Sequence, residues 1–353
     1  MIAPSPNRFW IVASADSSAR FRPCLSINIS SCKTITRKDN NVVYNSVMEI
    51  ANLERAAIRV ATSKDGQQIL QLINEAAYSH IHADWHVPGD WIGTPGFVVS
   101  EDPTPSRSLS SFGRMNRGFM ACLAAAADPP PAAWVRLAAI RRRPLAQEML
   151  AAMLDVVLPH LRESGVKELG WLAIDSWPDD VLPLLGFRRA NWITTFIKEG
   201  LNMPPAHRDN GVRVRPVRLE EMETLAAIEA DAFDPLWRHS AEGLRLAYGQ
   251  SICFDVALIN EQIVGFQYSA SNHHGSGAHL VRITVHPSFQ GARVGSALMT
   301  AAIEQYCRRG LKRVSLNTQI DNIASHRLYE KFGFYRTGDQ MPVWVMELGR
   351  GFE

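Results

Sequence analysis

Tyr329 is the side chain of this sequence best suited to donate a proton. Asn322, Ser325 and Tyr329 recur at spacings of three and four residues, so they share one face of a predicted short helix. Asn322 also suits the N-cap of this helix, which ends at Gly333. The expected buried stripe beside that face consists of Ala324, Leu328 and Phe332. A phenol in this position can protonate a leaving group; the alternative is a tyrosine packed at the helix rim with its hydroxyl in water.

His279 is one candidate proton acceptor, and other groups compete for this role. It begins a predicted strand, where an imidazole can accept a proton near neutral pH or simply be a surface residue. Three carboxylates near the end of an upstream helix are the other candidates: Glu229, Asp231 and Asp234. Phe233 and Trp237 belong to the same segment, and they either shape a pocket or cap the core.

Residues 290–295 form a turn rich in small residues between a strand and a helix. The strand covers residues 280–286, and the helix has apolar residues at helical spacing, namely Val294, Leu298, Ala302 and Tyr306. Such a turn presents unpaired backbone N–H groups and the positive end of the helix dipole, so it suits a diphosphate. The sequence lacks the Gly-Lys-Ser/Thr of a P-loop and any Gly-x-Gly-x-x-Gly, so ATP and NAD fit less well.

A second strand, over residues 313–320, follows this helix and leads into the short helix that carries Tyr329. The complete order resembles the acyl-CoA-binding core of the GNAT family of N-acetyltransferases, in which a Gln/Arg-x-x-Gly-x-Gly/Ala turn holds the coenzyme A pyrophosphate. Gly295 stands at a matching glycine position, whereas the first motif glycine aligns with Arg293. Arg293 still supplies a backbone N–H if its conformation is helical, and its guanidinium can reach a phosphate.

The resemblance implies transfer of an acetyl group from acetyl-CoA to an amine by direct attack, with the active site in the C-terminal unit. Tyr329 corresponds to the tyrosine that protonates the coenzyme A thiolate in many members. The predicted coenzyme-binding residues are Ile283, Thr284, Val285, Gln290, Gly291, Ala292, Arg293, Val294, Gly295, Ser296 and Asn322. Many members have a glutamate on the strand before the turn, where this chain has Arg282. That difference keeps open the alternative of a non-catalytic coenzyme A-binding sensor or scaffold.

The two halves of the chain repeat the same order of elements. Residues 134–140 echo residues 280–286, and each half later reaches a Gly-Phe pair. In the first half, residues 141–146 read Arg-Arg-Arg-Pro-Leu-Ala without a glycine, and no tyrosine matches Tyr329. Pro144 removes one N–H, so this unit is predicted to have lost its coenzyme site. The arginines either hold a phosphate by charge or form a solvated basic face.

The predicted fold class is α/β, with two tandem GNAT-like domains, each a twisted and mostly antiparallel sheet flanked by helices. We expect a disordered leader over residues 1–54, a degenerate GNAT-like domain over 55–199, a linker over 200–211 and the acetyltransferase domain over 212–350. The linker is rich in turn-forming residues.

Composition narrows the remaining expectations. The chain has 353 residues with a net charge of +2, which argues against a nucleic-acid partner, and no apolar run long enough to cross a membrane. Five scattered cysteines without CxxC spacing indicate a reducing cytosol, so we expect a cytoplasmic protein. His82 and His86 suggest zinc only weakly, and no metal is expected. The expected acceptor is a small-molecule amine or a peptide N-terminus, and a homodimer is left open.

Overall fold

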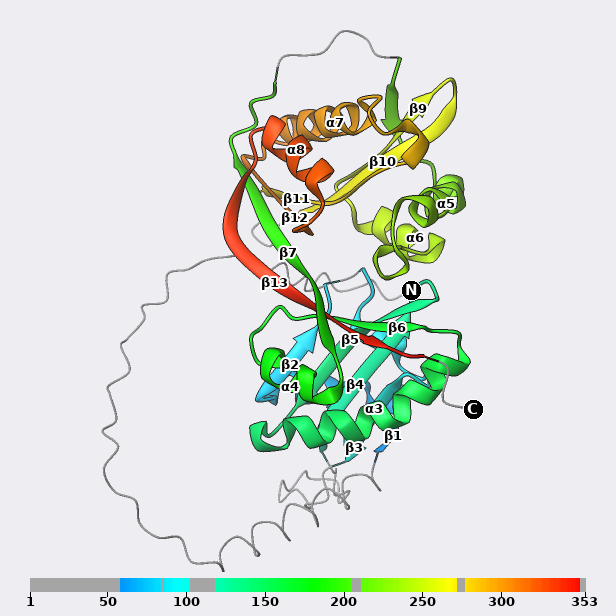
Figure 1. The fold of residues 1–353 in the computed structure, drawn as a ribbon, viewed down its shortest axis with the longest axis vertical. Helices are drawn as coiled ribbons and strands as arrows, with labels where there is room; N and C mark the ends of the chain where they lie inside the picture. Colours follow the sequence, from blue (N-terminus) through cyan, green and yellow to red (C-terminus); the bar gives the residue numbers. More distant parts are fainter. Residues whose placement is uncertain (1–57, 84, 102–117, 205–210, 272–276, 350–353) are drawn as a thin grey trace, which may run out of the picture.

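The computed structural model describes residues 58–83, 85–101, 118–204, 211–271 and 277–349. The predicted leader and half of the predicted linker therefore lie outside the described residues. One twisted thirteen-stranded sheet runs through both halves of the described chain, with helices on its faces (Figure 1). None of the described helices combines the length and the apolar character needed to cross a bilayer.

The N-terminal half begins the sheet. Its elements are β1 (Ile58–Val60), α2 (Gly66–Glu75), β2 (Tyr78–Ile81), β3 (Phe97–Glu101), β4 (Phe119–Ala127), β5 (Ala132–Ile140), α3 (Ala146–Glu163), β6 (Glu168–Leu172), α4 (Pro178–Val181) and β7 (Arg188–Glu199). The long helix α3 packs one side of the sheet, because Met149, Leu150 and Met153 form a buried face at helical spacing.

The C-terminal half repeats this order, except that a helix, α6, stands where the N-terminal half has the strand β2. Its elements are β8 (Arg213–Pro216), α5 (Met222–Ala232), α6 (Ala241–Gln250), β9 (Cys253–Ile259), β10 (Gln262–Ser271), β11 (Gly277–Val285), α7 (Val294–Arg308), β12 (Arg313–Gln319), α8 (Ile323–Lys331) and β13 (Tyr335–Glu347). The fold is the predicted α/β arrangement of two related units. In this half α7 buries Leu298, Ala302 and Tyr306 against the sheet, as their spacing predicts.

The last strands of the two halves are exchanged. β13 pairs with β6 of the N-terminal half, with Val343 opposite Leu172, and β7 pairs with β12 of the C-terminal half, with Phe196 opposite Leu316. β7 and β13 also pair with each other, so they form the long ribbon that crosses from one half to the other in Figure 1. The predicted domain limits at residues 199 and 212 therefore separate two segments of the chain, but the strands of these segments share one continuous sheet.

Each half contains one pair of parallel strands that separate partway along their length. β11 pairs with β12 from Gly277 to Leu280, and β5 pairs with β6 from Ala132 to Trp134. Beyond Leu280, β11 keeps only β10 as a strand partner among the described residues. In the N-terminal half, β2 instead pairs with β5 from Leu137 to Ile140. The edge of β11 beyond Leu280 therefore has no strand of the described chain beside it, whereas β2 occupies the corresponding edge of β5.

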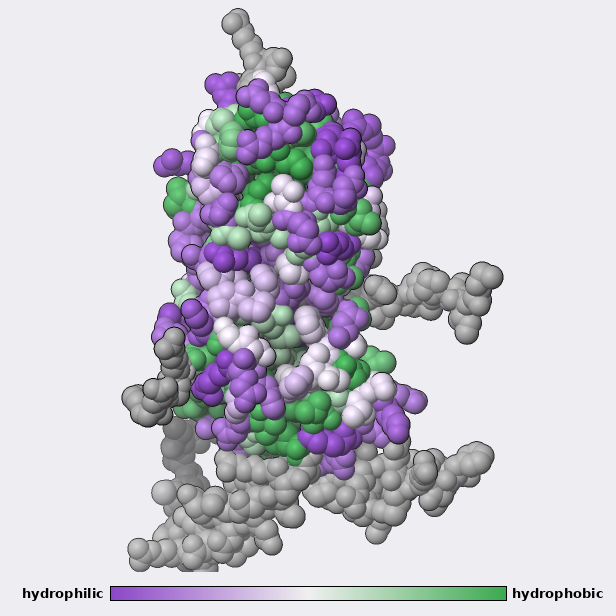
Figure 2. All heavy atoms as spheres, turned by 90° about the vertical axis from the view of Figure 1, so that its right-hand side faces the viewer, coloured by the Kyte–Doolittle hydropathy of each residue, from purple (hydrophilic) through white to green (hydrophobic). Residues whose placement is uncertain are grey.

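The outer surface is mixed in character. Figure 2 shows hydrophilic residues over much of one side of both halves, with hydrophobic residues visible in separate areas. The largest fully buried side chains, Trp171 and Tyr268 among them, belong to the cores that flank the sheet. Two hollows of the described structure are candidate ligand sites: the opening beside β11 and the space where the two halves meet.

Candidate active site

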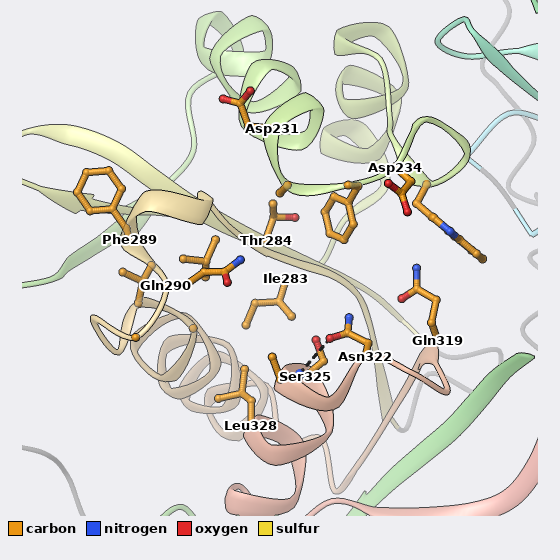
Figure 3. Close-up of a pocket in the computed structure, with 18 of the residues that line it drawn as sticks. Asp231, Asp234, Ile283, Thr284, Phe289, Gln290, Gln319, Asn322, Ser325 and Leu328 are labelled. Atoms are coloured by element: carbon orange, nitrogen blue, oxygen red, sulfur yellow. Dashed lines mark hydrogen bonds between the residues drawn. The ribbon is translucent and has the colours of Figure 1, made fainter. Parts of the chain in front are cut away.

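A groove of about 810 Å³ occupies the opening beside β11. Its walls come from the end of α5, the free edge of β11, the turn before α7 and the first turns of α7 and α8 (Figure 3). Every predicted coenzyme-binding residue except Ala292 lines this groove. The sequence pattern therefore identified a set of residues that the fold brings together.

The turn before α7 contains two residues in the left-handed region. Gly291 has φ +83° and Arg293 has φ +65°, so Arg293 does not adopt the helical conformation on which its expected backbone contribution depends. Arg293 is instead the N-cap, without a side-chain cap, and the helix begins at Val294. A left-handed conformation costs a residue other than glycine roughly 1–2 kcal/mol, which explains why related turns have glycine here. The N–H groups of the first helical turn, at Val294 to Ser296, have no intrahelical partner and can bind an anion.

The free edge of β11 supplies a second kind of binding group. Ile283, Thr284 and Val285 pair with β10 on one side only, opposite Gln267, Phe266 and Gly265. Their other edge faces the separation from β12, where backbone N–H and C=O groups can pair with an extended, amide-containing ligand as a neighbouring strand would.

The first turn of α8 closes the groove. Asn322 Oδ1 accepts a hydrogen bond from Ser325 N at 3.2 Å, so the predicted N-cap is confirmed (Figure 3). The predicted buried stripe is wrong in part, because Ala324 is exposed and Leu328 lines the groove, whereas Phe332 is buried. The residues of α8 that the core covers are His326 and Tyr329. Sequence spacing does not distinguish a helix face turned to an open groove from one turned to the core.

Tyr329 lies behind the groove wall. It is 5% exposed and packs against Phe196 and Phe334, with ring centroids 5.7 and 6.0 Å away. Burial raises the pKa of Tyr329 to about 12, although its hydrogen bond with the Ser325 side chain acts in the opposite direction. The phenol is therefore protonated at neutral pH, and Ser325, which does line the groove, connects it to the space where a ligand would lie.

His279 does not line the groove and lies instead in the wall of a second cavity, described below. It is 8% exposed, and its Nδ1 is 2.9 Å from Ser315 Oγ. Burial lowers the pKa of His279 to about 4. The ring is consequently neutral at pH 7 but a weak proton acceptor, because an efficient base has a pKa near the working pH.

Glu229 is engaged in a buried ion pair. Arg282 donates to both of its carboxylate oxygens, from Nε at 2.7 Å and from Nη2 at 2.6 Å, and Arg282 also bonds Trp237 O. Burial favours a higher pKa for Glu229, but the charges of Arg282 and His239 outweigh it and lower the pKa to about 2. Glu229 is thus a poor base. The other two carboxylate candidates, Asp231 and Asp234, are exposed at the rim of the groove.

His239 is a further candidate for acid–base chemistry that residue spacing in the sequence does not reveal. Glu229 Oε2 accepts from His239 N at 2.9 Å and lies 3.2 Å from His239 Nδ1. A carboxylate at Nδ1 favours the tautomer with the proton on Nδ1, which leaves a lone pair on Nε2. Glu229 and His239 are ten residues apart and do not lie on one helix or strand, so no regular spacing in the sequence predicts their contact.

We expect Glu229→Gln to destabilise the fold by about 3–5 kcal/mol at pH 7, because it leaves the charge of Arg282 buried without a counterion. The pKa of Glu229 is lower in the folded state than its ordinary value of 4.5. Its contribution is therefore present above about pH 4.5 and is lost as the pH falls towards 2. Denaturant unfolding should show a large difference between wild type and variant at pH 7 and a smaller one at pH 3. Glu223→Gln, on the exposed face of α5, is the control; an equal effect would contradict the assignment.

A second cavity of about 240 Å³, which we call the junction cavity, lies where the two halves meet. His82, Trp134 and Arg136 line it from the N-terminal half, and His239, His279 and Arg282 from the C-terminal half. Trp237, Arg238 and Gln319 line both this cavity and the groove, so the two spaces adjoin. The cavity thus brings residues of both halves beside the free edge of β11.

The corresponding region of the N-terminal half is built differently. β2 occupies the edge of β5, Arg141 pairs with Glu75 at 3.2 Å, and the guanidinium of Arg143 lies over the ring of Tyr78. His82 and His86, the two histidines that weakly suggested zinc, have different partners. His82 stacks on Trp134, and His86 contacts Asp128 at 3.0 Å. No group of three or more His, Cys, Asp or Glu side chains suited to a metal is found in the described part of the chain.

Comparison with known proteins places the C-terminal half in context. Residues 222–334 match the profile of the acetyltransferase (GNAT) family. The chain is 34% identical over 97 residues to a mycothiol acetyltransferase of Brachybacterium faecium, covering 27% of this chain and 29% of that protein. It is 33% identical over 87 residues to an N-acetylaspartate synthetase of Danio rerio, covering 25% and 31%. The match thus spans less than a third of either relative.

The fold comparison extends over more of the chain. A tandem GNAT protein from the clavulanic acid biosynthesis pathway, solved without AcCoA, superposes with a TM-score of 0.51 and 17% identity. The superposition covers 84% of this chain and 100% of that one. At this identity the likeness shows the fold, including its tandem arrangement.

Proposed function

We propose that the chain is an N-acetyltransferase of the GNAT family, whose profile residues 222–334 match, and that it moves an acetyl group from acetyl-CoA to an amine in its C-terminal half. The observation that carries this proposal is the groove, which joins the uncapped start of α7 to the free edge of β11. The first suits a diphosphate, and the second suits the amide-bearing pantetheine arm.

Each part of acetyl-CoA has a proposed set of contacts. The diphosphate binds the N–H groups of Val294, Gly295 and Ser296, with the guanidinium of Arg293 beside them. The pantetheine arm pairs with the backbone of residues 283–285. Asn322 and Ser325 face it from α8.

The proposed proton movements use one group on each side of the reacting thioester. His239 Nε2 accepts the proton of the attacking amine, because the Glu229 carboxylate holds the opposite ring nitrogen. We prefer His239 to His279, whose pKa is lowered to about 4. Tyr329 supplies the proton of the departing coenzyme A thiolate through the Ser325 hydroxyl. Amine N–C bond formation, C–S bond cleavage and the two proton transfers then balance to give an N-acetyl amine and free coenzyme A.

We expect one acetyl-CoA per chain. The N-terminal half has Pro144 and Leu145 where the C-terminal half has its small-residue turn, and β2 pairs with the edge of β5 that a pantetheine arm would need. Isothermal titration calorimetry of the full chain should give a stoichiometry of one, with a Kd within the range of about 1 μM to 1 mM typical of substrates. Two molecules per chain, the second lost on Arg142→Glu, would show that the N-terminal half also binds coenzyme.

Calorimetry and turnover together test the function itself. Binding of acetyl-CoA combined with transfer to a member of an amine panel supports the enzyme, and binding without any transfer supports a coenzyme A sensor or scaffold. Absence of binding would contradict both. The proposed acceptor is a small-molecule amine or a peptide N-terminus; the names of the two relatives, a mycothiol acetyltransferase and an N-acetylaspartate synthetase, are consistent with a small molecule.

A further inference from the structure

The junction cavity carries an excess of positive charge. Three arginines lie in or beside it, namely Arg136, Arg238 and Arg282, against two carboxylates, Asp128 and Glu229. Both carboxylates are occupied: Glu229 by Arg282 and His239, and Asp128 by His86 at 3.0 Å and by Ser240. The cavity therefore offers no carboxylate of the described chain that is free to pair with an ammonium group.

Arg238 is the cation available at the boundary of the two cavities. Its Nε donates to Phe233 O at 2.7 Å, which fixes the side chain, and no carboxylate of the described residues pairs with its terminal nitrogens. Arg282 differs, because Glu229 neutralises it. A guanidinium held by one nitrogen presents the other two in a planar fork, which is the geometry that binds a carboxylate through two hydrogen bonds.

Two tryptophans give the cavity an apolar wall. Trp134, from β5, and Trp237, from the segment before α6, meet edge to face with ring centroids 5.5 Å apart. Trp134 Nε1 donates to Leu236 O at 2.8 Å, so the ring is fixed in place and the two halves are tied together. Val281 and Met341 extend the apolar surface. A volume of about 240 Å³ suits a compact group rather than a long chain.

We propose that the junction cavity binds the acceptor, and that the acceptor is a small primary amine that also carries a carboxylate and a compact apolar or aromatic body. The inference rests on the proposed acetyl transfer. The carboxylate pairs with Arg238, the body packs against Trp134 and Trp237, and the amine faces His239 Nε2. Because no free carboxylate stabilises an ammonium there, the site favours the neutral amine that can attack the thioester. The N-terminal half thus contributes to acceptor choice through Trp134 and Arg136, although it is not proposed to bind coenzyme.

Matched pairs of amines test this inference on the full-length chain. Phenylalanine and tryptophan are compared with phenethylamine and tryptamine, which lack only the carboxylate, and spermidine represents a polycation. With acetyl-CoA as donor, we expect kcat/KM to be higher for the amino acids by on the order of tenfold or more, as for one charge-assisted bidentate contact. Arg238→Gln should reduce this ratio to about one, whereas Arg245→Gln, on the exposed surface of α6, should leave it unchanged.

A binding measurement keeps the test independent of turnover. Calorimetry on the chain saturated with coenzyme A should show tighter binding of N-acetylphenylalanine than of N-acetylphenethylamine, and Arg238→Gln should remove the difference. Equal use of both members of a pair, preference for spermidine, or a preference that survives Arg238→Gln would overturn the inference. Failure to bind acetyl-CoA at all would instead overturn the proposed function. Coenzyme binding without binding of either acetylated product would overturn the inference alone.

Discussion

Gly295→Asp should abolish acetyl-CoA binding. Gly295 stands in the first turn of α7, where the N–H groups without intrahelical partners line the groove. An aspartate there adds a negative charge beside the expected diphosphate. Two like charges about 4 Å apart repel by about 4 kcal/mol near a protein surface, which corresponds to roughly a thousandfold increase in Kd. Isothermal titration calorimetry of the full chain measures this directly.

Two control variants distinguish the effect of the added charge on binding from the effect of side-chain volume and from a general loss of stability. A Cβ at position 295 would lie 3.2 Å from Leu328 Cδ2 and 3.7 Å from Val285 Cγ2, so any side chain meets some resistance. Gly295→Asn adds nearly the same volume without the charge and should weaken binding less. Gly249→Asp adds the same charge at an exposed site on α6, where a Cβ meets nothing within 4 Å. If Gly295→Asp binds acetyl-CoA as well as Gly249→Asp does, the diphosphate lies elsewhere.

The predictable part of the site is the part built from neighbouring residues. The strand, turn and helix from Ile283 to Ser296 are continuous in the chain, so the small residues of the turn and the apolar period of α7 were sufficient to predict them. The exception is Arg293. Arginine has no preference for the left-handed conformation that its backbone adopts here. The geometry of the turn imposes this conformation, so the residue type could not predict it.

What could not be predicted depends on contacts between distant residues. The exchange of β7 and β13 follows from which edges the two half-sheets leave unpaired, and no local period encodes that choice. The pairing of β2 with β5 occupies a strand edge that stays free on β11 in the described structure, yet the sequence of β2 resembles that of any short strand. The junction cavity likewise depends on contacts between distant residues, such as that of Trp134 with Trp237.

The same long-range assembly explains why the sequence alone does not identify the proton acceptor. From the sequence, Glu229 and His279 were both candidates, because each type of residue can accept a proton. The fold gives Glu229 a buried arginine and gives His279 a desolvated position, and both effects lower the pKa. The proposed base, His239, becomes recognisable only once Glu229 is seen beside its Nδ1.

Tyr329→Phe should lower kcat by a factor on the order of 10² to 10⁴, the range for loss of a general acid, and should leave the Kd for acetyl-CoA nearly unchanged. The phenol does not line the groove, so the coenzyme loses no direct contact. Because the pKa of Tyr329 is raised to about 12, the wild-type acid stays protonated across the neutral range, and its titration should not limit kcat below about pH 11. Steady-state kinetics and calorimetry on the same preparations separate the two effects.

Two further variants decide whether Tyr329 acts as an acid or only as packing. If the proton passes through Ser325, then Ser325→Ala should reproduce much of the loss in kcat, whereas Tyr335→Phe, at an exposed position on β13, should change nothing. The phenylalanine keeps the ring between Phe196 and Phe334, so only the hydrogen bond of about 1 kcal/mol is lost from stability. An unchanged kcat for Tyr329→Phe would show that Tyr329 has only a structural role. The thiolate would then take its proton from solvent in the groove.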